Sequence, residues 1–170
     1  MRFKKNPWFW IAAIISLVLD HLTKFWVVQN FELRHPPLSP DSKPLLSGVF
    51  HFTYVVNTGA AFSFFSNGGV IWLRWLSLGV SVGLMILAWF GPRINRWEQA
   101  GYGLILGGAL GNGIDRFVSG HVVDFLDFRL IRFPVFNLAD VFINAGIICL
   151  LIATFHSPPS PRKQDDSISE

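Results

Sequence analysis

Four long runs of apolar residues dominate the pattern along the chain. They cover about residues 8–28, 70–90, 99–114 and 138–155. An α-helix needs roughly 20 residues, at about 1.5 Å each, to cross the hydrocarbon core of a bilayer. The runs come close to that length and lack the one-sided apolar stripe of a helix on a soluble core. The pattern therefore predicts an all-α membrane protein with four transmembrane helices.

Two segments between these runs alternate with the period of a β-strand. In the first, Phe50, Phe52, Tyr54 and Val56 would share one side, and the turn composition of Asn57-Thr58-Gly59 follows them. In the second, residues 122–133, alternation is partial, and Leu130 is expected to extend the strand. We expect a small extracytoplasmic antiparallel β-sheet on the outer membrane face.

Composition agrees with a membrane protein of one domain. Only 15% of the 170 residues are charged, whereas soluble domains average roughly 25%. Seven Trp and seventeen Phe suit a bilayer and its interfaces. Residues 1–157 are expected to form a single integral membrane domain. Residues 158–170 are polar and are predicted to be a disordered cytoplasmic tail.

Basic residues orient the helices, because cytoplasmic segments carry an excess of Lys and Arg. They occur at the N-terminus, between the second and third runs, and in the tail: Arg2, Lys4, Lys5, Arg93, Arg96, Arg162 and Lys163. With four spans, these segments share one side, so both termini are expected in the cytoplasm. This distribution accounts for the net charge of +3 without a nucleic-acid partner.

Glycines recur at intervals of four residues in two of the runs. Gly103, Gly107 and Gly111 would form one face of the third helix, and Gly79 and Gly83 one face of the second. Small residues let helices in lipid approach closely. Both faces are therefore predicted to pack against neighbouring helices.

Several polar residues lie within or next to the apolar runs, where inserting a polar side chain into lipid costs free energy. Each of them is therefore a candidate functional residue. Asp20 and Lys24 are four residues apart and are expected to neutralise each other on one helical face; Lys24 as the base for a serine nucleophile is a less favoured alternative. Asn112, Asp115 and Arg116 close the third run on one face. They would either buttress the structure near the outer surface or contact a substrate.

Three further aspartates follow the third run, two of them before the fourth run and one at its start. Asp127, beside Arg129, resembles an exposed strand residue. Asp140 starts the fourth run three residues after Asn137, which favours a helix cap. Asp124 has no such structural explanation. Two carboxylates at one interface cannot both ionise easily, so one can activate water while the other donates a proton. Asp124 and Asp140 are a plausible pair of this kind.

Other chemistries find less support in the sequence. The five histidines lack metal-binding spacing, and no GxSxG, Walker or CxxC motif occurs. Asn57 is either a turn residue or a contact for an extended backbone. A proton or ion carrier could use the same aspartates, but would more naturally place them mid-span between repeats. Neither a metal nor a cofactor is implied.

Five short motifs, in order and nearly end to end, resemble those of the lipoprotein signal peptidases (signal peptidase II), a family of bacterial intramembrane aspartyl peptidases. They are DHLTK at 20–24, NTGAAFS at 57–63, GNGIDR at 111–116, GHVVDF at 120–125 and FNLAD at 136–140. Gly113 departs from the family, which usually has a larger aliphatic residue there. The end of the third helix is therefore expected to be looser.

The resemblance implies a catalytic pair, Asp124 and Asp140. Because Asp140 lies at a helix start, we expect it to be the ionised partner in the free enzyme. The resemblance also implies a set of residues that support the pair or bind substrate: Asp20, Lys24, Asn57, Gly59, Asn112, Asp115, Arg116 and Asn137. The implied substrate is a diacylglyceryl-modified prolipoprotein, cut before its lipidated cysteine. The implied enzyme is a monomer of the bacterial inner membrane, active near the outer face and inhibited by globomycin-type cyclic peptides.

Overall fold

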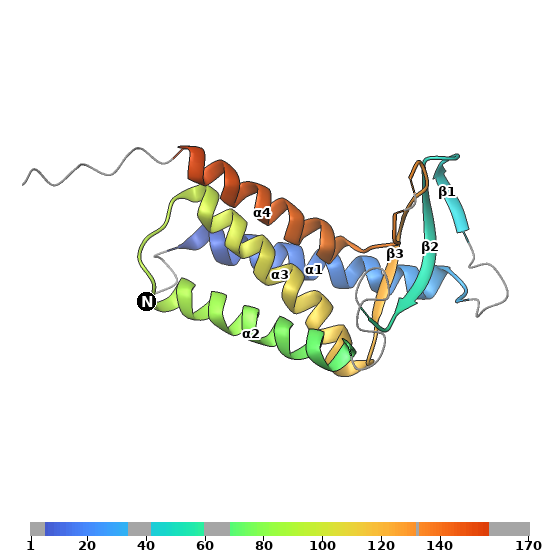
Figure 1. Cartoon of the computed structure of the whole chain (residues 1–170), viewed down its shortest axis with the longest axis horizontal. Helices are drawn as coiled ribbons and strands as arrows, with labels where there is room; N and C mark the ends of the chain where they lie inside the picture. The colour runs from blue at the N-terminus through green and yellow to red at the C-terminus, as the bar shows by residue number, and fades with distance from the viewer. Residues whose placement is uncertain (1–5, 34–41, 60–68, 132, 157–170) are drawn as a thin grey trace, which may run out of the picture.

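Four helices run side by side along the molecule, and a small sheet lies across one end of them (Figure 1). The computed structural model describes residues 6–33, 42–59, 69–131 and 133–156. Its elements are α1 Pro7–Asn30, β1 Ser42–Leu46, β2 Phe50–Asn57, α2 Gly69–Phe90, α3 Arg96–Val118, β3 Val122–Phe128 and α4 Leu138–His156. The tail at 158–170 lies outside the described residues, so its disorder stays a prediction.

Each predicted helix is present, but α3 extends beyond the apolar run at both ends. It begins at Arg96 because a capping box forms there: Glu98 N–H donates to Asn95 Oδ1 at 2.9 Å, and Asn95 N–H donates to Glu98 Oε2 at 2.8 Å. At its other end the helix continues to Val118. Gly113 is buried inside it, and the helix continues without a break past this residue, so a looser helix end stays a prediction.

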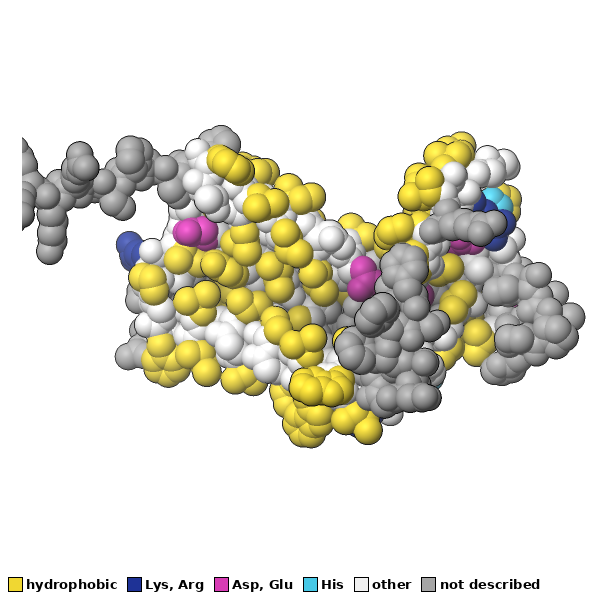
Figure 2. Space-filling model, in the orientation of Figure 1, with side chains coloured by type: hydrophobic (Ala, Val, Ile, Leu, Met, Phe, Trp, Pro, Cys, Tyr) yellow, Lys and Arg dark blue, Asp and Glu magenta, His cyan; other side chains and the backbone are white. Residues whose placement is uncertain are grey.

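In the part of the chain that the structure describes, three helices are long and apolar enough to span a membrane: α1, residues 71–90 of α2, and residues 138–155 of α4. Hydrophobic side chains cover much of the visible helical surface (Figure 2). In contrast, α3 is rich in glycine and polar residues and packs against the other three helices. A fourth membrane span, and the position of the sheet at the outer face, stay predictions.

The glycine face of α3 packs against α1, as predicted. A Cβ at Gly103 would collide with the Phe9 carbonyl oxygen, and one at Gly107 with the Ser16 hydroxyl. The prediction for α2 is wrong. Gly79 and Gly83 are exposed, and no described atom lies within 4 Å of the position that a Cβ would take at either residue. Spacing alone identifies a small-residue face, but only a neighbour decides whether the face is used.

The sheet has the order β1-β2-β3, and both pairs are antiparallel. On β2 the predicted apolar face is confirmed in part: Phe52, Tyr54 and Val56 pack in one cluster with Val27 of α1. A bulge between Phe52 and Val55 breaks strict alternation. The pattern of hydrophobic and polar residues did not predict β1. It also placed Leu130 in the last strand, whereas β3 ends at Phe128 and a turn follows.

Asp127 is not an exposed strand residue. Its side chain is 14% exposed, and its Oδ2 accepts hydrogen bonds from Thr53 Oγ1 at 2.7 Å and Arg129 Nε at 2.8 Å. Arg129 Nη2 also donates to Ser42 Oγ at 2.7 Å. Because these partners come from all three strands or their ends, the Asp127–Arg129 ion pair and its hydrogen bonds connect the three strands.

Candidate active site

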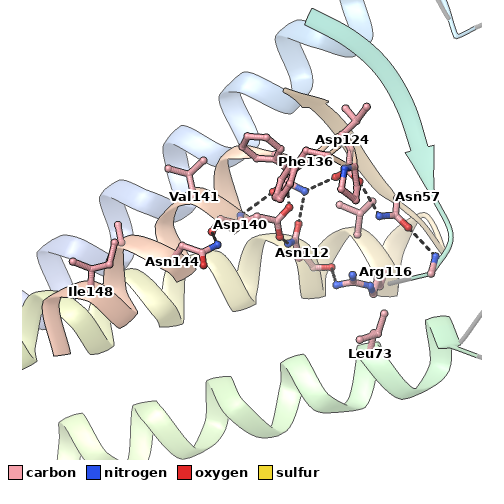
Figure 3. Close-up of a pocket in the computed structure, with 17 residues that line it drawn as sticks. Asn57, Leu73, Asn112, Arg116, Asp124, Phe136, Asp140, Val141, Asn144 and Ile148 are labelled. Atoms are coloured by element: carbon pink, nitrogen blue, oxygen red, sulfur yellow. Dashed lines mark hydrogen bonds between the residues drawn. The ribbon is translucent and has the colours of Figure 1, made fainter. Parts of the chain in front are cut away.

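A pocket of about 630 Å³ opens where the sheet meets the ends of α3 and α4. Figure 3 shows side chains from strands and helices converging there, with Leu73 of α2 on the far side. Most of the lining is apolar. Its polar members are Asn57, Asn112, Arg116, Asp124, Asn137, Asp140 and Asn144. The pocket thus combines an apolar wall with a compact group of hydrogen-bonding side chains.

Asn137, which is fully buried just before α4, connects the two candidate aspartates. Its side-chain Nδ2 donates to Asp124 Oδ1 at 2.7 Å, and its backbone N–H donates to Asp140 Oδ2 at 3.2 Å. In return, Asp140 N–H donates to Asn137 Oδ1 at 3.1 Å. The predicted cap is therefore present, and the same contacts hold both carboxylates at one pocket.

Asp124 lies on β3 and is only 3% exposed. Its second oxygen, Oδ2, accepts a hydrogen bond from Asn57 Nδ2 at 2.8 Å. Burial raises the pKa of Asp124 to about 6; hydrogen bonds from Asn57 and Asn137 oppose the rise, while the nearby Asp140 adds to it. This carboxyl group can therefore hold a proton close to neutral pH.

Asn57 takes the turn role that was one of its two alternatives, and it also contacts Asp124; a contact with an extended backbone stays a prediction. Its Oδ1 accepts a hydrogen bond from Gly59 N–H at 2.9 Å, which is a turn contact, while its Nδ2 holds Asp124. Gly59 also lines the pocket. The residues that follow, 60–68, lie outside the described part of the chain.

Asp140 is positioned from two sides in the first turn of α4. Besides the contact with Asn137, its Oδ1 accepts a hydrogen bond from Asn112 Nδ2 at 2.8 Å. The N-terminus of a helix favours a negative charge, because unpaired backbone N–H groups point out of it. Both carboxylate oxygens of Asp140 are thus held by hydrogen bonds at the start of α4.

Lys24 is the centre of a buried charge cluster behind the pocket. Its Nζ lies 2.7 Å from Asp20 Oδ2 and 2.7 Å from Asp115 Oδ2, and it donates to Asn112 Oδ1 at 2.9 Å. Asp20 Oδ1 in turn accepts Ala139 N–H at 2.9 Å, next to the start of α4. The predicted Asp20–Lys24 pair is confirmed. Lys24 contacts carboxylates and an amide rather than a serine, which does not favour the serine-base alternative.

The predicted buttress at the end of α3 divides into two parts. Asp115 pairs with Lys24 and is not among the pocket-lining residues. Arg116 lines the pocket, and its Nη1 donates to Asn112 O at 3.2 Å. Arg74 of α2 donates to Arg116 O at 2.6 Å, so it secures the end of α3.

The sequence analysis missed one polar residue of the pocket, Asn144. It lies one helical turn after Asp140, and its Nδ2 donates to the Asp140 carbonyl oxygen at 2.8 Å. An asparagine four residues beyond a candidate catalytic aspartate, inside an apolar run, was the available signal. Among the described residues, no group of three or more His, Cys, Asp or Glu side chains could hold a metal ion.

Two carboxylates with different surroundings, beside an apolar cavity, suit acid–base chemistry on an apolar substrate. A family model described as "Signal peptidase (SPase) II" matches residues 12–156. The chain belongs to the signal peptidase II family. The resemblance drawn from the five motifs is thereby confirmed at the level of the family.

Relatives and a solved structure agree with this membership. A lipoprotein signal peptidase from a Cyanothece strain is 70% identical over 165 residues, covering 97% of this chain and 92% of the relative. One from Microcystis aeruginosa is 69% identical over 153 residues, covering 90% and 95%. A solved bacterial membrane enzyme superposes with a TM-score of 0.76 at 25% identity, covering 91% of this chain and 92% of that chain.

Proposed function

We propose that this chain removes signal peptides from diacylglyceryl-modified prolipoproteins by cutting before the lipidated cysteine. It would do so as an aspartic endopeptidase, with Asp124 and Asp140 as its catalytic residues. The observation that carries the mechanism is the position of Asn137, which donates to both carboxylates at 2.7 and 3.2 Å. The family membership and the names of the relatives support the substrate class.

In this mechanism Asp140 is ionised and Asp124 is protonated in the free enzyme. Asp140 takes a proton from water, whose oxygen attacks the carbonyl carbon before the cysteine, while Asp124 gives its proton to the carbonyl oxygen. The tetrahedral intermediate then collapses: Asp140 gives its proton to the leaving amine, and Asp124 recovers one from the hydroxyl group. The helix start at Asp140 and the raised pKa of Asp124 support this assignment.

The remaining polar residues of the site would support the pair or bind the substrate. Asn57 and Asn137 fix Asp124, while Lys24 acts on Asp140 through Asn112. The guanidinium of Arg116 is placed to bind substrate, since it lines the pocket. Asp20 and Asp115 would neutralise Lys24 in a low-dielectric environment, where an unpaired ammonium group is costly.

We also propose that the protein is a four-span protein of the bacterial inner membrane, with both termini in the cytoplasm. The start of α1, the α2–α3 connection and the end of α4 lie at one end of the bundle, and the sheet and pocket lie at the other (Figure 1). The basic residues flank the first of these ends. The pocket would then sit near the outer leaflet, where a diacylated cysteine can arrive laterally. We expect the protein to act as a monomer.

The test is cleavage of a diacylglyceryl-modified prolipoprotein by the purified protein in detergent or lipid, followed by gel shift. Wild type should cut before the lipidated cysteine, and Asp124→Asn and Asp140→Asn should lose roughly a thousandfold or more in kcat while still binding substrate. An Asp127→Asn variant is the matched control and should keep activity, because Asp127 pairs within the sheet. Full activity in either dyad variant would refute the mechanism. A globomycin-type cyclic peptide should compete with the substrate.

A further inference from the structure

Asn144 is a polar side chain in an otherwise apolar part of α4. Its exposed neighbours on the helix include Val141, Ile147, Ile148 and Leu151. An amide in such surroundings is costly in lipid unless it is hydrogen-bonded. Since Asn144 is exposed and lines the pocket, it faces the space that a substrate would occupy (Figure 3).

The hydrogen bond to the helix fixes which atoms of Asn144 face the pocket. A backbone carbonyl can only accept, so the contact with Asp140 O at 2.8 Å assigns the donor as Nδ2. Within the described part of the chain, Oδ1 is left without a hydrogen-bond donor. The residue therefore offers a free acceptor about one turn below the catalytic aspartates.

We propose that Asn144 Oδ1 accepts a hydrogen bond from a backbone N–H of the signal peptide and so positions the scissile bond. This inference rests on the proposed function. The diacylglyceryl group consists of hydrocarbon chains, esters and a thioether, none of which has an N–H or O–H donor. The peptide backbone has one donor at each non-proline residue, and signal-peptide side chains near a membrane are mostly apolar.

The position of Asn144 also selects which N–H it binds. Four residues along α4 place it about 6 Å deeper than Asp140, and an extended peptide advances about 3.3 Å per residue. The partner N–H should lie about two residues before the scissile bond, on the side of the signal peptide. A side chain that binds substrate there would act on KM more than on kcat, because the contact forms before the chemical step.

Asn144→Val and Asn144→Thr form the test pair, because the two side chains have the same shape and only threonine has a hydroxyl. That hydroxyl can donate to Asp140 O and still accept from a substrate. On a diacylglyceryl-modified prolipoprotein peptide, Asn144→Val should raise KM about tenfold with little change in kcat, and Asn144→Thr should stay within about threefold of wild type. Asn30→Val is the matched control, since Asn30 makes the same contact with Trp26 O at 2.8 Å outside the pocket.

Single N-methylation of each of the four residues before the cysteine then locates the contact. At one position, about two residues before the scissile bond, N-methylation of the substrate should raise the KM of wild type by a larger factor than it raises the KM of Asn144→Val. The inference would be overturned if Asn144→Val had the KM of wild type, or if N-methylation raised KM equally at all four positions. It would also be overturned if the effect of Asn144→Val changed only when ether-linked lipid replaced the lipid esters. None of these outcomes would contradict the proposed function. Failure of wild type to cut the unmodified substrate would refute both.

Discussion

Asn137 Nδ2 lies 2.7 Å from Asp124 Oδ1, which joins the start of α4 to strand β3. The backbone of the same asparagine caps the helix through Asp140. The side chain of Asn137 thus donates to Asp124, and its backbone N–H donates to Asp140. The local capping of a helix and the assembly of the site are therefore one set of contacts.

The pH dependence of cleavage should follow the proton held by Asp124. In the proposed mechanism the active free enzyme carries one proton on the pair, and burial raises the pKa of Asp124 to about 6. kcat/KM should therefore fall above about pH 6, by tenfold per pH unit. Replacing Asn57 by Leu removes a hydrogen bond that lowers this pKa, so the alkaline limb should move to higher pH. A limb that moves to lower pH would contradict the assignment.

The same carboxyl group should make stability depend on pH. The pKa of Asp124 rises from 3.8 to about 6 on folding, so the folded state binds its proton more tightly than the unfolded state. Its contribution is most favourable below about pH 4 and is lost as pH rises through 6, by about 3 kcal/mol. Between pH 4 and 7, the unfolding free energy of Asp124→Asn in detergent should rise by about 2–2.5 kcal/mol relative to that of wild type. A constant difference would show that Asp124 is not perturbed.

Removing the Lys24 ammonium should be costly, because Asp20 and Asp115 would remain close together without a cation. Lys24 is 4% exposed, and loss of one partner of a buried ion pair typically costs about 3–5 kcal/mol. Lys24→Met should therefore lower the unfolding free energy by about that amount. Lys43→Met is the matched control on the exposed β1, where the expected loss is about 1 kcal/mol or less. Equal effects would mean that the buried cluster has no special role.

Two glycines with similar sequence surroundings should respond differently to alanine. At Gly107 a methyl group would meet the Ser16 hydroxyl and separate α1 from α3, which should cost about 1–3 kcal/mol. At Gly79 the space is open, so alanine should be neutral or stabilise α2 by up to about 1 kcal/mol. Thermal unfolding in detergent measures both. Ser16→Ala should recover part of the Gly107→Ala loss. Without any recovery, the Ser16 hydroxyl is not the main cause, and the Ala13 carbonyl oxygen, 2.6 Å from the position of the added Cβ, would account for the loss.

Local patterns were sufficient to predict the four helices, two of the three strands and much of the site. The apolar runs predicted all four helices, and the spacing of Asp20 and Lys24 predicted their pair. The asparagine before Asp140 predicted a helix cap. These features depend on residues within one or two turns of each other, so sequence spacing translates directly into distance.

Longer-range contacts were not predictable in this way. Asp127 was expected to be exposed, but Thr53 and Arg129 bind it across the sheet. The glycine face of α2 was expected to pack, but none of the described helices lies against it. Asn144 was overlooked because an isolated polar residue in an apolar run has no meaning until the pocket beside it is known.

By itself, the sequence determined the apolar helices, the alternating face of β2 and the residue types available for acid–base chemistry. These follow from hydrophobicity and from the fixed periods of helices and strands. Tertiary structure alone decided that Asn137 joins Asp124 to Asp140 and that Lys24 is shared by Asp20 and Asp115. Those contacts join residues from separate elements, and their distances depend on how closely the helices pack.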